Sequence, residues 1–120
     1  MPLKDDIIRI ERGFWTGGED YFRENLDETC MLAFPQMAGT FSRDEVAATA
    51  KQPQRWRDLE TEEKGFLQPT REIVLIDYEA RAVRGSGEPY RALVSTLYVR
   101  RGNDWKMAYH GQTPLEEKDA

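Results

Sequence analysis

Histidine, cysteine and long apolar runs are almost absent from this sequence. The single histidine, His110, lies far along the chain from the single cysteine, Cys30. A structural zinc site normally takes four ligands from these two residue types, so we expect no metal and no cofactor. Without a second cysteine or a nearby histidine, we interpret Cys30 as a small buried residue of a strand. No run of about 18 apolar residues is present, so no membrane span is predicted.

Basic residues are also too few for a surface that binds nucleic acid. The chain carries 17 Lys and Arg against 22 Asp and Glu, a formal net charge of -5. Binding a phosphate backbone needs a broad basic surface, so we expect no nucleic-acid partner. The first residues lack the cationic start and apolar core of a signal peptide, which favours a cytoplasmic protein. The length suits one core, and residues 1–120 are predicted to form one domain.

Helical signals dominate the first half of the chain. Ile7, Ile10 and Phe14 recur at helical spacing. Ser42 and Glu45 have the spacing of a capping box, which opens a helix. Two helices, a strand and a third helix are therefore predicted, over Leu3–Thr16, from Glu19 to Leu26, from Asp27 to Phe34, and from Ser42 to about Gln52.

The second half has the pattern of an antiparallel sheet. Alternating residues separated by turn signals predict four strands, over Trp56–Leu67, Glu72–Arg84, Tyr90–Arg101 and Asp104–Gln112. The predicted order is α-α-β-α-β-β-β-β. Helices segregated to one side of a mainly antiparallel sheet define the α+β class.

The register of the last three strands predicts a row of polar side chains. A two-residue turn at Gly102-Asn103 would pair Ser95 with His110, and a four-residue loop before Pro89 would place Tyr78 beside Ser95. Gln112 lies one step along, and aliphatic residues surround the row. A few polar groups in an apolar concavity are typical of small-molecule sites. The alternative is a hydrogen-bond network that only satisfies buried groups in the core. A shift of one residue would move these side chains to the other face.

Two aromatic residues are predicted at the rim of this pocket. Trp15 and Tyr21 flank the Gly17-Gly18 break between the first two helices. We therefore assign both to the mouth of the pocket, although either could belong to the core.

The opposite face of the last hairpin is predicted to be an interface. Its apolar side chains are too many to leave in water as one patch. A second copy of the chain across a two-fold axis would cover them, so we expect a homodimer. The alternative cover is a loop or Trp56 of the same chain. The interface residues are Tyr98, Trp105, Met107 and Tyr109.

The closing segment resembles a known superfamily. Its features are a strand that ends in basic residues, a Gly102-Asn103 turn, Trp105 at the start of the last strand, and the ending His110-x-Gln112-Thr113-Pro114. With the predicted element order, they resemble the nuclear transport factor 2-like proteins, also called cystatin-like α+β cones. The ending is similar to that of the small bacterial, SnoaL-like branch of unknown function. The resemblance implies a cone-shaped cavity between the helices and a curved sheet, and dimers that pack through the outer sheet face.

The resemblance does not extend to the chemistry of ketosteroid isomerases, which share this fold. Those enzymes carry an Asp base just before a proline-led turn, where this chain has Phe34 before Pro35. The sequence register places Ser95 where an acid would face His110, and the first helix carries Ile10 where the isomerases have a Tyr. These differences argue against isomerase chemistry by that mechanism.

The sequence therefore predicts a cone domain that binds a small, mostly apolar molecule. Tyr78, Ser95 and His110 would contact its polar end, with Gln112, Trp15 and Tyr21 nearby. In a lyase, isomerase or cyclase, His110 would be the general acid or base, because imidazole exchanges protons near neutral pH, and Tyr78 would orient the substrate. The alternatives are a carrier or sensor that only binds, and a dimerisation module whose cone is filled. A cavity of about 300 Å³ or more that reaches His110 would argue against the last.

Overall fold

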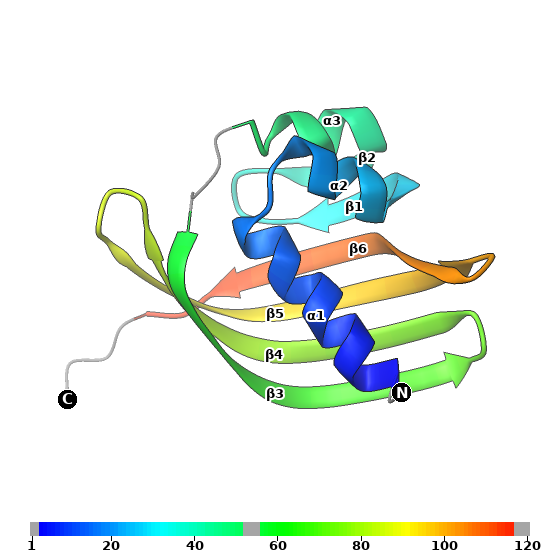
Figure 1. Cartoon of the computed structure of the whole chain (residues 1–120). Helices are drawn as coiled ribbons and strands as arrows, with labels where there is room; N and C mark the ends of the chain where they lie inside the picture. Colours follow the sequence, from blue (N-terminus) through cyan, green and yellow to red (C-terminus); the bar gives the residue numbers. More distant parts are fainter. Residues whose placement is uncertain (1–2, 52–55, 117–120) are drawn as a thin grey trace.

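Helices cover one face of a six-stranded sheet in the computed structural model, which describes residues 3–51 and 56–116 (Figure 1). The α+β class is confirmed. The elements are α1 (Leu3–Thr16), α2 (Glu19–Asn25), β1 (Leu26–Ala33), β2 (Ala38–Ser42), α3 (Arg43–Ala48), β3 (Trp56–Thr70), β4 (Ile73–Arg84), β5 (Pro89–Arg101) and β6 (Asp104–Pro114).

The strand order in the sheet is β2-β1-β6-β5-β4-β3. β1 pairs with β6 in parallel, and the other pairs are antiparallel. Strand β2 is an addition to the predicted order. Four of its five residues are exposed, so it has no apolar alternation for a sequence pattern to detect.

Helix α1 lies across the concave face of the sheet, and α2 and α3 lie over its β1–β2 end (Figure 1). Ile7, Glu11, Phe14 and Trp15 are buried, and their spacing of four, three and one residues places them on one helix face. No helix among the described residues is long and apolar enough to cross a membrane.

The predicted capping box opens α3. The Glu45 backbone N–H donates to Ser42 Oγ at 3.1 Å, and the Ser42 backbone N–H donates to Glu45 Oε1 at 2.8 Å. The helix is short, with its last residue at Ala48. The predicted end near Gln52 lies outside the described residues.

The predicted register of β5 is wrong by one residue on both sides. Arg101 pairs with Asp104 as expected, but a bulge between Leu97 and Tyr98 leaves Ala108 unpaired, so His110 pairs with Thr96 and not with Ser95. On the other side, Pro89 pairs with Val83, so Tyr78 pairs with Val94. Because strand side chains alternate, each side chain of β5 lies on the face of the sheet opposite to the predicted one. We call this strand turned over relative to the prediction.

The turned strand changes the predicted interface. Tyr98 and Met107 are 0% and 3% exposed and belong to the core. Trp105 is half-buried and also packs against the core. Tyr109 pairs with Leu97 on the outer face. The predicted interface therefore does not form one outer patch. Of its four residues, Tyr98, Trp105 and Met107 face the core, and only Tyr109 lies on the outer face.

Candidate functional site

A cavity of about 460 Å³ lies between the helices and the β1–β6 half of the sheet. Each helix contributes an apolar wall residue: Phe14 from α1, Phe22 from α2 and Val46 from α3. The sheet contributes Leu26, Leu32 and Met107. The walls are thus the same side chains that form the core, and they enclose a space that remains unfilled.

The polar end of this cavity comes from the last strand. His110 and Gln112 are two residues apart on β6, so both project from the same face, and both line the cavity. Gln112 Nε2 lies 3.0 Å from His110 Nε2, and the Tyr90 hydroxyl donates to Gln112 Oε1 at 2.7 Å. The His110 ring meets Phe34 edge to face, with centroids 5.6 Å apart.

The other side of His110 faces a buried carboxylate. Glu11 of α1 is 2% exposed, and its Oε2 lies 3.4 Å from His110 Nδ1. Thr96 lies between them, with its hydroxyl 2.8 Å from Nδ1 and donating to Glu11 Oε2 at 2.9 Å. The Glu–His pair is therefore bridged by a hydroxyl and sits wholly inside the protein.

Two tyrosines complete the environment of Glu11. Tyr98 donates to Oε1 at 2.6 Å, and Tyr78 donates to Oε2 at 2.5 Å. The Trp15 indole N–H in turn donates to the Tyr78 hydroxyl at 3.0 Å. A continuous set of hydrogen bonds thus runs from Tyr90 through His110 and Glu11 to Trp15.

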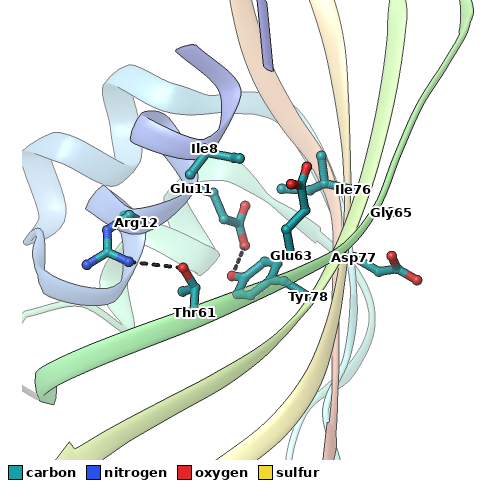
Figure 2. A pocket seen from close by; sticks show the side chains of 9 residues that line it. All are labelled: Ile8, Glu11, Arg12, Thr61, Glu63, Gly65, Ile76, Asp77 and Tyr78. Atoms are coloured by element: carbon teal, nitrogen blue, oxygen red, sulfur yellow. Dashed lines mark hydrogen bonds between the residues drawn. The ribbon is translucent and has the colours of Figure 1, made fainter. Parts of the chain in front are cut away.

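A second, smaller pocket of about 30 Å³ lies on the α1–β3–β4 side of Glu11. Figure 2 shows Glu11 extending from α1 toward the Tyr78 hydroxyl, with Arg12 bonded to Thr61 at the edge of the pocket. Its volume suits about one water molecule, so it is too small for an organic ligand. The main cavity is the candidate ligand site.

The electrostatics keep Glu11 ionised. Burial alone would raise the pKa of this carboxyl, but the charge of His110 and the hydrogen bonds from His110, Tyr78 and Tyr98 bring its pKa below the ordinary value. Burial and then the Glu11 charge raise the pKa of Tyr78 and of Tyr98 well above the usual range. Both phenols therefore remain protonated donors to the carboxylate.

The hydrogen-bond directions fix the protons on His110. Thr96 has one hydroxyl proton and donates it to Glu11, so His110 Nδ1 must carry the proton in its bond to Thr96. Gln112 accepts from Tyr90 through Oε1, which turns its NH₂ group toward His110 Nε2. When the imidazole is neutral, this pattern places its proton on Nδ1 and turns the lone pair of Nε2 toward the Gln112 NH₂ group.

The residues predicted for the site fall into two groups. His110, Gln112 and Trp15 line the cavity. Tyr78, Ser95 and Tyr21 do not. The Tyr78 hydroxyl points at Glu11, and Ser95 is exposed on the outer face because β5 is turned over. Tyr21 packs across Gly13, where a Cβ would lie 2.1 Å from its hydroxyl oxygen, and this hydroxyl donates to the Ile10 carbonyl.

Glu11 is the main site residue that the sequence interpretation missed. It lies four residues after Ile7 and three before Phe14, in the middle of the apolar face of α1. A carboxylate at the centre of such a face is unexpected, because a buried charge is costly unless it is paired. The position of Glu11 on this apolar face was therefore the one feature of the sequence that could have indicated a buried partner for its carboxylate.

Potential metal ligands are scattered in the described part of the chain, and the one thiol is buried. No group of three His, Cys, Asp or Glu side chains that could hold a metal ion occurs in residues 3–51 and 56–116. Cys30 is buried, and burial raises the pKa of its thiol to about 12. It is therefore an unreactive core residue.

Comparison with known proteins gives a fold and no activity. No protein-family model and no curated protein matches the chain. A ketosteroid isomerase-like protein from Erwinia carotovora atroseptica superposes with a TM-score of 0.74 at 12% identity, over 96% of this chain and 95% of that one. An NTF-2 like protein of unknown function from Shewanella oneidensis gives 0.72 at 15% identity, over 92% and 98%.

A third similar structure is named for an association domain. It comes from Exiguobacterium sibiricum, carries the name of a Ca/calmodulin-dependent kinase II association domain, and gives a TM-score of 0.72 at 16% identity over 98% of both chains. Identities this low establish the fold alone. The predicted resemblance is thereby confirmed at the level of the fold, and the chain has the nuclear transport factor 2-like, cystatin-like α+β cone fold.

Proposed function

We propose that this chain binds one small, mostly apolar molecule in the main cavity, with one end of the molecule against His110 and Gln112. The cavity carries the proposal: its volume of about 460 Å³ lies in the usual range for small-molecule sites, roughly 300–1,000 Å³. Apolar residues form most of its walls, and His110 and Gln112 supply polar groups at its inner end. A dimerisation module with a filled cone would not need this space.

A ligand screen with a cavity-filling variant tests the proposal. Compounds that raise the melting temperature of the wild type should lose the effect in Val46→Phe, because the larger side chain would occupy the cavity. Val99→Phe adds the same bulk on β5 outside the cavity lining and should retain binding. Equal stabilisation of all three proteins would mean that the compounds bind elsewhere.

Acid–base catalysis at His110 is a second candidate function, favoured by the position of Glu11. The imidazole would take a proton from the ligand at Nε2 once the Gln112 NH₂ group gives up its bond to that atom, while Glu11 stabilises the resulting positive charge from the Nδ1 side. Tyr78 keeps a role in this proposal as a donor that positions Glu11, since its hydroxyl does not line the cavity. Lyase, isomerase and cyclase reactions remain the candidate classes.

A comparison of binding with turnover separates the two candidates. With a ligand from the screen, His110→Ala should abolish turnover and retain affinity within a few-fold if the imidazole transfers a proton. Absence of turnover in the wild type across the screened ligands would leave binding as the function.

We also propose that two copies associate through the outer face of the sheet. Register pairs join five apolar side chains into one row across five strands: Leu67 with Leu75, Leu75 with Leu97, Leu97 with Tyr109, and Tyr109 with Met31. Met31 and Leu67 are 52% and 60% exposed. With strands about 4.8 Å apart, the row is roughly 20 Å long. A continuous apolar row of this length supports burial against a second copy.

A further inference from the structure

Among the described residues, one permanent charge lines the main cavity. Arg84, the last residue of β4, is the only Lys, Arg, Asp or Glu among the described residues of the lining. It is exposed, whereas His110 is buried. Arg84 therefore marks the mouth of the cavity, and His110 marks its inner end.

Aromatic rings hold the Arg84 guanidinium at this mouth. Its Cζ lies 5.0 Å from the Trp56 ring centroid and 4.7 Å from the Tyr90 ring centroid. Contacts of this kind use the face of the guanidinium and leave its N–H edges available. Trp56 and Tyr90 also line the cavity, so the cation and its aromatic support belong to the same site.

The donors of this guanidinium have no acceptor within the described part of the chain. No hydrogen bond and no ion pair joins the side chain of Arg84 to any residue in 3–51 or 56–116. Elsewhere the chain supplies such partners. Arg101 binds both oxygens of Asp27 at 2.9 and 2.8 Å, and Arg91 binds Glu79 at 2.8 Å. The aromatic rings thus hold the Arg84 guanidinium at the entrance of an apolar cavity, with its N–H donors available to a ligand.

Resting on the binding function proposed above, we propose that the ligand is an apolar monocarboxylate whose carboxylate binds Arg84. A planar carboxylate matches the guanidinium fork with two parallel hydrogen bonds. One arginine balances one negative charge, whereas a doubly charged phosphate would need further cations, which the described residues of the lining do not supply. The apolar body lies against Phe14, Leu32 and Val46, and its far end reaches His110 and Gln112.

Matched acids and alcohols provide the test. The probes are octanoate with octanol and naphthylacetate with naphthylethanol, measured by isothermal titration calorimetry with the full chain at neutral pH. In the wild type, each acid should bind about tenfold or more tightly than its alcohol, since charge-assisted bonds to Arg84 add to the same apolar contacts. The affinity for the acids should fall as salt is added.

The variants assign the preference to Arg84. Arg84→Gln should remove the preference for the acids and leave the alcohol affinities unchanged, which also reports that the cavity is intact. Arg71→Gln, in the turn at the other end of β4, removes one positive charge away from the cavity and should retain the preference.

The outcomes separate this inference from the binding function beneath it. Equal affinities for acid and alcohol in the wild type, or a preference that survives in Arg84→Gln, would overturn the carboxylate assignment and leave binding in place. Failure of both members of both pairs to bind would contradict the apolar-ligand function, and the carboxylate assignment with it.

Discussion

Glu11 is the residue on which the interior of this protein depends. Its carboxylate has three hydroxyl donors and a histidine within 3.4 Å, and together they attach α1 to β4, β5 and β6. Replacing this carboxylate is strongly destabilising, because three buried hydroxyls and the imidazole lose their charged acceptor.

Glu11→Gln should therefore lower the free energy of unfolding by about 3 kcal/mol or more at pH 7. Because the pKa of Glu11 in the folded protein lies below its ordinary value of 4.5, its stabilisation is fully present above that value and is lost as the pH falls through the folded pKa. Urea unfolding at a series of pH values would measure both effects, and the two proteins should converge in acid.

Glu63→Gln is the matched control for this substitution. Glu63 pairs with Lys4 on the surface, where an ion pair contributes little, so its loss should change stability by less than about 1 kcal/mol. A difference between wild type and Glu11→Gln that stays constant from neutral pH into acid would show that the Glu11 charge does not contribute.

The protons of His110 can be observed directly, because it is the only histidine in the chain. At a pH where the imidazole is neutral, we expect the Nδ1–H tautomer, since Thr96 accepts from Nδ1 and Gln112 donates to Nε2. Long-range ¹H–¹⁵N spectra distinguish the tautomers. A dominant Nε2–H form would contradict the proposed proton-accepting atom on the cavity side.

At the level of single residues, the sequence predicted His110 and Gln112 in the cavity but failed to predict the partners of His110. Ser95 is predicted beside the imidazole, but the one-residue shift in register places Thr96 there. Glu11 comes from an element 99 positions away in the chain, and strand register carries no information about it.

Among the elements, helices were easier to predict than strand pairings. Leu3–Thr16 was predicted with its observed bounds because the apolar spacing and the Gly17-Gly18 stop agree. The pairing of β5 failed because a bulge and a loop length each shift the register by one, and neither has a composition signal in Leu97–Tyr98 or in Gly85–Glu88.

The capping box of α3 is an element-scale feature that can be tested separately. Ser42→Ala should reduce the free energy of unfolding by about 1 kcal/mol, because the Glu45 backbone N–H loses its acceptor. Ser86→Ala, in the turn between β4 and β5, should stay within about 0.5 kcal/mol of the wild type. Equal effects of the two substitutions in chemical denaturation would argue against the cap as a stabilising element.

For the whole molecule, the fold followed from the element order, and the two functional surfaces had to be reassigned. The inner face contains the cavity and the Glu11 network, and the outer face contains the apolar row from Leu67 to Met31. Both reassignments follow from the register of β5. Tyr98, which is predicted on the outer face, lies in the core, and Leu97, which is predicted on the inner face, lies on the outer face.

If two copies associate through the apolar row from Leu67 to Met31, a charge placed within that row should break the dimer. Leu75→Asp places a charge at the second position of the row and should convert a dimer to a monomer in sedimentation velocity. Ser86→Asp adds the same charge in a turn and should leave the dimer intact. A wild type that sediments as a monomer at all concentrations would contradict the proposed interface.

The central claim is that a small apolar molecule occupies the main cavity against His110, and the imidazole resonances of this single histidine test it most directly. During titration with naphthylethanol, the uncharged probe, the His110 signals should shift and saturate with the dissociation constant found by calorimetry, and Val46→Phe should abolish the shift. Saturable binding that leaves the His110 resonances unmoved would contradict the account.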